Sequence, residues 1–347
     1  MLLTRARQQW LPLALAVALA ALVMLVLSSG DATVGAAVSA LGRGAFGSWY
    51  QFSSGTLVRA TPLMFTGLAV AIAFRAGVFN IGAEGQFLMG AAAAAALSGV
   101  LHPQVGVLTP WLAILAGGLA GALWASIADG LRRRFAVPEV IATILLNFVA
   151  LYLVGYLVRG PLQEPTHVYP QTKTLEAIAR LPHLGTTSRL HWGFPLGAGL
   201  AVAIAFWLRR TASGFRLRLV GANPQAARVT GRVDAARVTS AAFLASGALA
   251  GMGGAVEVNG VTFALYENIS PGYGYTAIAV ALLAGLDPLW VILTAIGFGA
   301  LESGATAMQR DAGVPSVIAA IVEASIILIA IAWSSRSRGD AVSERGT

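Results

Sequence analysis

Long apolar segments recur along this chain, and they constrain its fold more than any other feature of the sequence. At about 1.5 Å per helical residue, a run of about 20 apolar residues spans a hydrocarbon core of about 30 Å. The composition agrees, because 57% of the 347 residues are hydrophobic and only 11% are charged, against about 25% charged residues in soluble domains. We therefore expect an all-α polytopic membrane protein.

Ten crossings are predicted, within a single transmembrane domain that covers residues 1–347. The apolar segments are Trp10 to Leu27, Leu57 to Phe74, Phe87 to Leu101, Trp111 to Leu131, Val140 to Val158, Phe194 to Leu208, Thr239 to Val258, Tyr275 to Leu286, Leu289 to Met308 and Val314 to Trp333. The first is expected to remain as a span, since the apolar region of a cleaved signal peptide normally has about 7–15 residues.

The basic residues predict the orientation, because cytoplasmic loops are enriched in Lys and Arg. With the N-terminus inside, 16 of the 23 basic residues fall on the inner side: Arg5, Arg7, Arg75, Arg132, Arg133, Arg134, Arg209, Arg210, Arg216, Arg218, Arg228, Arg232, Arg237, Arg336, Arg338 and Arg345. The outer side keeps Arg43, Arg59, Arg159, Lys173, Arg180, Arg189 and Arg310. Four of these seven lie in one long outer loop, residues 159–193, and long loops cross largely regardless of charge. Both termini are therefore expected in the cytoplasm.

Several function classes are excluded by what the sequence lacks. There is no cysteine, which excludes a disulfide scaffold and a thiolate metal site. Lys173, the only lysine, stands in Gln-Thr-Lys-Thr and so forms no phosphate-binding P-loop. The four histidines lack metal-ligand spacing, and long apolar tracts separate the arginines that a nucleic-acid surface would group. We expect no catalysis, no metal, no cofactor and no nucleic-acid binding, with any ATP hydrolysis on a separate chain.

Two places predict discontinuous helices. Phe79-Asn-Ile-Gly-Ala-Glu-Gly-Gln86 interrupts an otherwise apolar region, and the segment Tyr275 to Leu286 has only a dozen residues. Irregular backbone at membrane depth is tolerated only where protein or a water-filled cavity satisfies its polar groups. Both breaks therefore indicate a pathway through the helix bundle.

Polar residues near these breaks are the candidates for lining that pathway. They are Asn80, Glu84, Gln86, Asn147 and Glu302. An ionisable group at the centre of a span costs at least about 2.5–3.5 kcal/mol, so each needs a polar partner or water. The first three offer a carboxylate and amides to the hydrogen-bonding groups of a ligand, or else Glu84 satisfies backbone amides freed at the helix break. Asn147 either lines the same cavity or bridges two helices.

Other residues in the spans have a packing interpretation. Tyr273 and Tyr275 either stack on a base or lie at the membrane interface, where tyrosine is common. Gly247 and Gly251 are four residues apart in the span Thr239 to Val258. Small residues at this spacing are expected to let another helix approach closely.

The largest inner segment, residues 209–237, contains seven arginines and predicts a short helix. Asn223 before Pro224 is typical of an N-cap followed by the first helical position, and Gly231 is placed to end the helix. Ala226 and Ala227 would lie on its surface, ready to enter a groove on a cytoplasmic partner. The alternative is a solvated loop without a partner.

Two blocks resemble a known family. Gly221-Ala-Asn-Pro-Gln-Ala-Ala-Arg-Val-Thr-Gly231, with Ala242-Phe-Leu-Ala-Ser-Gly-Ala-Leu-Ala-Gly251 after it, resembles the coupling-loop signature of bacterial ABC importer permeases of the ribose and branched-chain amino acid superfamily. Ala73-Phe-Arg-Ala-Gly-Val-Phe-Asn-Ile-Gly-Ala-Glu-Gly-Gln86 is similar to the block of the nucleoside and simple-sugar subgroup. The resemblance extends over residues 57–332.

This resemblance implies a transport subunit rather than an enzyme. It implies a nucleoside importer of the bacterial cytoplasmic membrane, with a simple sugar as the alternative substrate; an ion-coupled secondary transporter is a more distant alternative. The implied partners are an ATPase chain with two nucleotide-binding domains, a second permease chain and an external substrate-binding lipoprotein. Residues 209–237 become the coupling loop, in which Gly221, Asn223, Ala226, Ala227 and Gly231 contact the ATPase.

Overall fold

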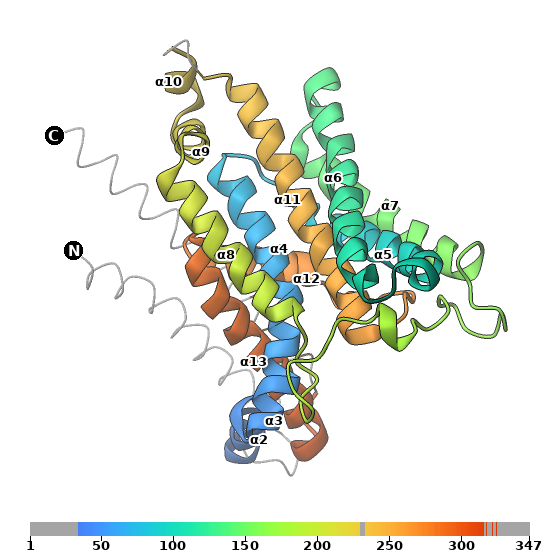
Figure 1. Ribbon diagram of the computed structural model, residues 1–347. Coiled ribbons are helices and arrows are strands. Elements are labelled where there is room, and N and C mark those ends of the chain that lie inside the picture. The colour runs from blue at the N-terminus through green and yellow to red at the C-terminus, as the bar shows by residue number, and fades with distance from the viewer. Residues whose placement is uncertain (1–33, 230–232, 316, 318–320, 322–323, 325–347) are drawn as a thin grey trace. The chain divides into compact units, whose positions relative to one another are not determined.

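The structure, a computed structural model, describes residues 34–229, 233–315, 317, 321 and 324, and they are mainly helical (Figure 1). In chain order the elements are α2 (Val34–Phe46), α3 (Trp49–Gln51), the π-helix η1 (Phe52–Leu57), α4 (Val58–Arg75), α5 (Ala83–Val105), η2 (Gly106–Leu108), α6 (Thr109–Phe135), α7 (Glu139–Arg159), η3 (Ala177–Ala179), α8 (Gly193–Arg210), α9 (Ala212–Ala222), α10 (Pro224–Val229), α11 (Ala235–Glu257), the π-helix η4 (Val258–Thr262), α12 (Tyr273–Leu283) and α13 (Pro288–Ala312). Across the described residues the β-structure consists of two isolated bridges. The all-α fold class is confirmed for this part of the chain.

Each of the eight predicted spans between Leu57 and Met308 falls on a helix. Within the described residues, six helical segments are long and apolar enough to cross a membrane: Trp49–Arg75, Ala83–Leu101, Gly106–Phe135, Glu139–Arg159, Ala235–Thr262 and Pro288–Ala312. The first predicted span lies outside the described residues, as does most of the last. The total of ten crossings therefore stays a prediction.

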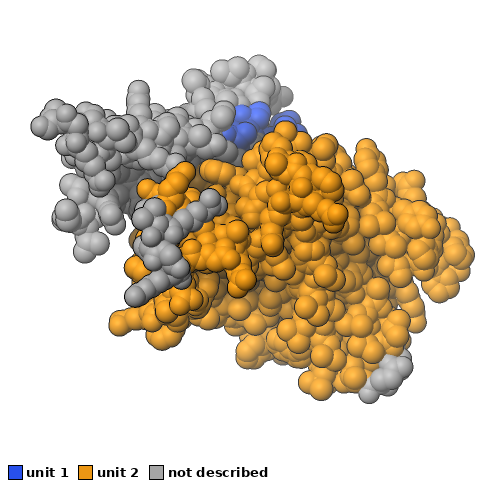
Figure 2. Space-filling model, turned by 90° about the horizontal axis from the view of Figure 1, so that it is seen from above, with its two compact units in different colours: residues 1–59, 296–347 blue, residues 60–295 orange. Residues whose placement is uncertain are grey.

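The chain divides into two compact units, coloured separately in Figure 2. Unit 1 comprises residues 1–59 and 296–347, and unit 2 comprises residues 60–295. In the described part of unit 1, Ser303 donates a hydrogen bond to the carbonyl of Gly44 at 3.0 Å, and Thr56 donates one to the carbonyl of Ala45 at 2.8 Å. These bonds join α2, η1 and the second half of α13.

Unit 2 is built around three closely packed helices, α5, α6 and α11. A Cβ added at Gly251 would overlap the carbonyl oxygen of Gly117 and lie 2.9 Å from the Cα of Gly121, and one added at Gly90 would overlap the backbone of Gly251. These glycines, with Gly247, form what we call the glycine seam. The predicted close approach at Gly247 and Gly251 is confirmed: the backbones of three helices touch there without side chains between them.

The long loop between α7 and α8 is attached to the end of α11. The amide of Leu181 donates to the carbonyl of Asn259 at 2.8 Å, and the amide of Leu175 donates to the carbonyl of Phe263 at 2.7 Å. The Arg180 guanidinium lies 4.4 Å from the centre of the Phe263 ring, a cation–π contact. This end of unit 2, opposite to α9 and α10 in Figure 1, is called the loop end.

Candidate functional site

The break predicted between Phe79 and Gln86 is present, and it brings two helix N-termini together. Helix α4 ends at Arg75 and α5 begins at Ala83, with turns and irregular backbone between them. A Cβ at Gly274 would overlap the backbone amide of Glu84, so the first turns of α12 and α5 are in contact. Helix α12 has 11 residues, about 16 Å at the usual rise, which is too short to span a bilayer alone.

Glu84 lies at this contact and is buried. Its Oε2 accepts a hydrogen bond from the amide of Gly274 at 2.7 Å, and Ser270 also hydrogen-bonds to the carboxylate. Helix N-termini carry partial positive charge and unpaired N–H groups, so a carboxylate between two of them is well placed. This geometry agrees with the expectation that Glu84 satisfies a backbone amide. The amide belongs to Gly274 of α12, however, and not to the helix break between α4 and α5.

Asn80 and Gln86 pair with each other beside Glu84. The Asn80 amide donates to Oε1 of Gln86 and to the hydroxyl of Ser246, both at 2.9 Å. Its Oδ1 accepts from the amide of Gly82 at 2.9 Å and from Nε2 of Gln86 at 3.1 Å. Both side chains are at most 1% exposed. Asn80 therefore holds the irregular segment to α5 and α11.

Asn147 connects α7 to the same place. Its Oδ1 accepts from the amide of Gly85 at 2.8 Å, and its Nδ2 donates to the carbonyl of Ile81 at 2.9 Å and to the Tyr275 hydroxyl at 3.3 Å. The geometry is that of a bridging amide. Asn80, Glu84, Gln86 and Asn147, brought together by four elements, are called the polar junction.

Sequence reasoning missed two members of this region, Ser246 and Glu139. Ser246 lies in the middle of an apolar span, where a serine carries no distinctive signal. Glu139 accepts from the amide of Phe79 at 2.9 Å, which ties the break to the start of α7. Its position directly after Pro138 indicates a helix start but not its partner. Tyr275, for which two roles were open, places its hydroxyl against Asn147.

Glu302 is separate from the polar junction along the chain and lies in unit 1. Its Oε2 is 4.0 Å from Nε of Arg59, and its side chain is 20% exposed. This ion pair explains how the charge of Glu302 is balanced within an apolar helix. A role for it in the pathway stays a prediction.

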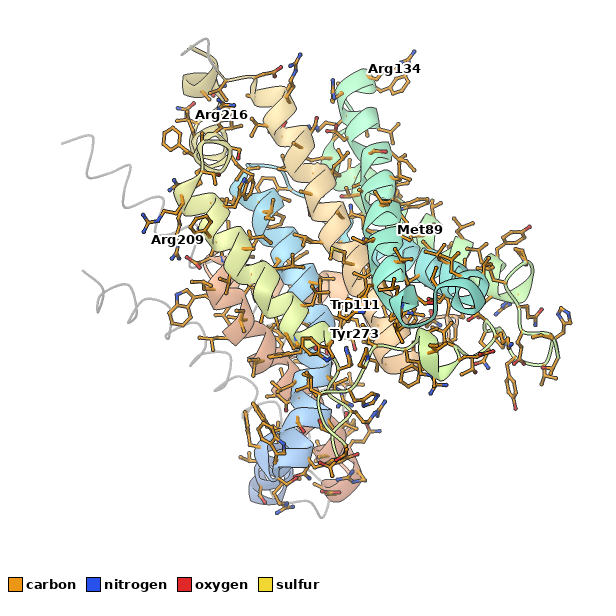
Figure 3. All side chains as sticks on the ribbon, in the orientation of Figure 1. Met89, Trp111, Arg134, Arg209, Arg216 and Tyr273 are labelled. Carbon is orange, nitrogen blue, oxygen red and sulfur yellow. The ribbon has the colours of Figure 1, made fainter. Side chains whose placement is uncertain are left out.

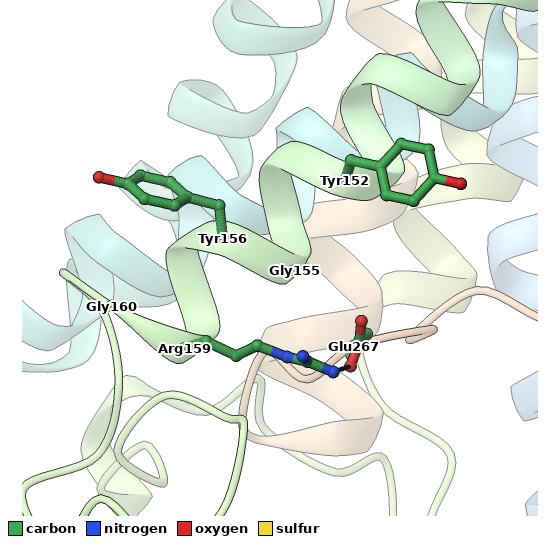
Figure 4. Close-up of a pocket in the computed structure, with 6 residues that line it drawn as sticks. All are labelled: Tyr152, Gly155, Tyr156, Arg159, Gly160 and Glu267. Carbon is green, nitrogen blue, oxygen red and sulfur yellow. Dashed lines mark hydrogen bonds and ion pairs between the residues drawn. The ribbon is translucent and has the colours of Figure 1, made fainter.

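A pocket of about 310 Å³ lies at the loop end of α7 (Figure 4). It is lined by Tyr152, Gly155, Tyr156, Arg159, Gly160 and Glu267. Arg159 donates to Glu267 at 2.5 Å, so the two charges compensate each other. Tyrosines beside a paired charge at the end of a span are typical of a membrane interface. None of these residues belongs to the polar junction.

The segment predicted to dock a partner forms two helices, α9 and α10. Asn223 has extended backbone angles and its carbonyl accepts from the amide of Ala227 at 3.1 Å, while Pro224 is the first residue of α10. The predicted start of the helix is confirmed. Gly231 and the side chain of Ala226 lie outside the part of the chain that the structure describes.

The predicted exposure of Ala227 is wrong. Its side chain is fully buried and packs with Val220 of α9 and Ala235 of α11. An alanine at this position is small enough to let α9, α10 and the start of α11 pack closely, and this packing competes with exposure to a partner. Gly221 is likewise a packing residue, since a Cβ there would overlap the carbonyl oxygen of Arg75. Pro224 and Gln225, at the start of α10, are exposed.

Comparisons with known proteins agree on one family. The family described as the permease component of branched-chain amino acid transport systems matches residues 52–331. A guanosine ABC transporter permease protein of Bacillus subtilis is 37% identical over 91% of this chain and 90% of its own length. A glucose ABC transporter permease protein of Haloferax volcanii is 39% identical over 79% of this chain and 74% of its own.

A nucleoside ABC transporter permease protein of Lactococcus lactis is 32% identical over 78% of this chain and 77% of its own length. No solved structure matches the chain. Three relatives of comparable similarity therefore carry names for two kinds of substrate, nucleosides and glucose.

Proposed function

Since this chain belongs to the permease family of branched-chain amino acid transport systems, we propose that it is the transmembrane subunit of an ATP-driven nucleoside importer. The single observation that carries the substrate class is the similarity to the guanosine permease of Bacillus subtilis, which covers nine-tenths of both chains. The nucleoside permease of Lactococcus lactis adds to it. Glucose is the second candidate, because the Haloferax volcanii relative is at least as similar in sequence.

The polar junction is the proposed place where substrate crosses unit 2. Its amides and carboxylate are the groups that recognise hydroxyls and base edges. In the described conformation these groups are occupied by one another and by backbone amides. Passage then consists of exchanging hydrogen bonds between helices for hydrogen bonds to the nucleoside, which keeps the buried polar groups satisfied throughout.

The energy source is assigned to partner subunits. The chain contains no P-loop, so an ATPase chain with two nucleotide-binding domains is proposed to contact α10 and the last residues of α9, from Gly221 onward. A second permease chain and an external substrate-binding lipoprotein complete the assembly. Displacement of the ATPase domains would move α10, which packs on α9 and α11 through Ala227, as part of a rigid-body shift.

Location follows from the charges and the family. We assign the protein to the bacterial cytoplasmic membrane, with both termini and the arginine-rich segment 209–237 inside. Arg134 of α6 and Arg216 of α9 lie toward the same end of unit 2 in Figure 3, whereas Trp111 lies toward the other. Because arginines are enriched on the cytoplasmic side of membrane proteins, their position at one end of unit 2 supports this orientation.

Uptake of labelled nucleosides and glucose in cells with and without this chain tests the proposal. Guanosine uptake is expected to require the chain and to stop on ATP depletion, while an ionophore that removes ion gradients leaves it unchanged. Glucose uptake with the same dependence selects the second candidate. Loss of uptake with the ionophore alone would indicate a secondary transporter and contradict the proposal.

A further inference from the structure

Five arginines lie on the last turns of α4 and α8 and on α9. They are Arg75, Arg209, Arg210, Arg216 and Arg218, called here the arginine patch. Asp287 is the carboxylate within it, and its Oδ2 accepts from Arg209 at 2.6 Å. The charges of Asp287, Arg209 and Arg218 all act on the Arg75 guanidinium. Three of these arginines, Arg75, Arg209 and Arg218, therefore share one nearby carboxylate, which leaves a local excess of positive charge.

Most of these guanidinium groups are accessible. The Arg209 side chain is 53% exposed, and Arg210, Arg216 and Arg218 are exposed as well. Figure 3 labels Arg209 and Arg216 at the end of unit 2 formed by α8 and α9. Arg75 is partly buried beneath them. Repulsion among these arginines is relieved when an anion binds to the patch.

Exposed apolar strips lead directly into the arginine patch. On α8, Val202 and Phe206 are 55% and 64% exposed and four residues apart, and Arg210 continues the same face. On α13, Trp290 and Leu293 are 50% and 58% exposed and follow Asp287. The Arg209–Asp287 ion pair joins the ends of these two helices, so both strips meet the charges at one place.

We propose that the arginine patch binds the phosphate of an anionic phospholipid, whose acyl chains lie along the exposed strips of α8 and α13. Guanidinium forks match phosphate oxygens bidentately. Exposed Phe215 on α9 and Trp290 on α13 are aromatic residues of the kind found at headgroup level. Arginines at the end of an apolar helix carry their alkyl stems in the apolar region and their charge at the headgroups.

An acidic surface on a partner protein is the competing occupant. It would satisfy the arginines, but a partner in water would leave uncovered the apolar residues that run from the patch along α8 and α13. A phospholipid covers both parts, because it joins a charged head to long apolar chains. The inference concerns this surface alone and does not depend on which substrate is carried.

The test uses the full chain in nanodiscs of phosphatidylcholine that contain spin-labelled phosphatidylglycerol or spin-labelled phosphatidylcholine. The motionally restricted fraction reports the relative affinity of each lipid for the protein. We expect wild type to prefer phosphatidylglycerol, and Arg210→Gln and Arg218→Gln each to reduce that preference about fivefold. Arg209 and Arg75 are left intact, so that the ion pair with Asp287 remains.

Arg134→Gln is the matched control, since Arg134 is also exposed at the end of a long helix and beside an exposed aromatic residue, Phe135. It should leave the lipid preference unchanged. The thermal midpoint of each variant is measured, and an Arg→Lys variant at position 210 or 218 replaces any that unfolds, with partial retention of the preference expected.

Four results would overturn the proposal. They are equal binding of both lipids by wild type, an equal loss in Arg134→Gln, displacement of the labelled lipid by inorganic phosphate alone, and unchanged lipid preference in the patch variants. In the last case, loss of ATPase-subunit binding by the same variants would assign the arginine patch to the protein partner instead.

Discussion

The glycine seam and the polar junction are both buried in unit 2, and they hold helices together in opposite ways. In the seam, backbones touch because Gly90, Gly117 and Gly251 leave no side chain between them. In the junction, Glu84 and Asn147 fill the contact and exchange hydrogen bonds with backbone groups of other helices. The seam therefore permits one arrangement of its helices. The junction permits others, since its bonds can be transferred to a ligand without leaving polar groups unpaired.

Filling the seam is expected to have the largest effect. Gly251→Leu places a side chain where the carbonyl oxygen of Gly117 and the Cα of Gly121 already lie. Overpacking a dense contact costs about 1–3 kcal/mol or more, and here backbone would have to move. We expect little folded protein on size-exclusion chromatography after extraction, whatever substrate is supplied.

Gly199→Leu on α8 is the matched control, because a Cβ there meets no atom within 4 Å. This variant should elute as wild type does. A folded, transporting Gly251→Leu protein would show that the three backbones are not held at contact distance.

His191, in the loop between α7 and α8, is both closely packed and hydrogen-bonded to backbone. Its burial leads us to expect that the stability of the protein depends on pH. A Cβ at Gly260 would lie 2.6 Å from its fully buried ring, and its Nδ1 accepts from the amide of Gly193 at 3.1 Å. Its Nε2 is buried and has no hydrogen-bond partner. Burial, with the nearby charges of His183 and Arg189, lowers the pKa of His191 from 6.5 to about 4.

A lowered histidine pKa means that the folded state holds the neutral ring, so stability is complete above pH about 6.5 and is lost as the pH falls toward about 4. The loss is on the order of 3 kcal/mol at most. Thermal midpoints measured across this range should fall with acid in wild type and stay flat in His191→Gln. His183→Gln, which changes an exposed histidine of the same loop, leaves burial as the main cause of the lowered pKa and should keep most of the wild-type slope; a flat profile in that variant would assign the effect to His183.

Changes in the polar junction are expected to have the smallest effect on stability and a large effect on transport. Glu84→Ala leaves the Gly274 amide and two helix N-termini without their acceptor, which costs about 1–3 kcal/mol. Glu84→Gln retains an acceptor and should be less destabilised. We expect both variants to fold and to lose guanosine uptake, measured in cells at matched membrane levels of the protein. Full uptake by Glu84→Ala would remove the polar junction from the pathway.

Much of this arrangement could be predicted from the sequence. The helix break at Asn80 is visible because two glycines and three polar side chains interrupt an apolar run, and the start of α10 is visible because Asn223 precedes Pro224. The seam is visible as Gly247 and Gly251 at helical spacing. All three are local patterns, set by backbone geometry and by the exclusion of polar groups from lipid.

The failures have a different origin. Ala227 was expected at the surface because small residues suit a docking helix, yet it is buried against α9 and α11. Ser246 and Glu139 carried too little local signal to be joined to Asn80 and Phe79. The ion pair of Glu302 with Arg59 was likewise not predicted, and its role in the pathway stays a prediction. Each of these depends on contacts between residues far apart in the chain.

The sequence by itself determined that this chain is a helical membrane protein of a permease family and contains no P-loop, because hydropathy and sequence motifs are properties of local segments. Only the tertiary structure decided that Glu84 stabilises the start of α12, that Asn147 bridges three elements, and that Arg209 and Arg218 lie near Arg75 and Asp287. The physical reason is that a buried polar or charged group is defined by its partners in space, and those partners come from helices whose neighbours the sequence does not name.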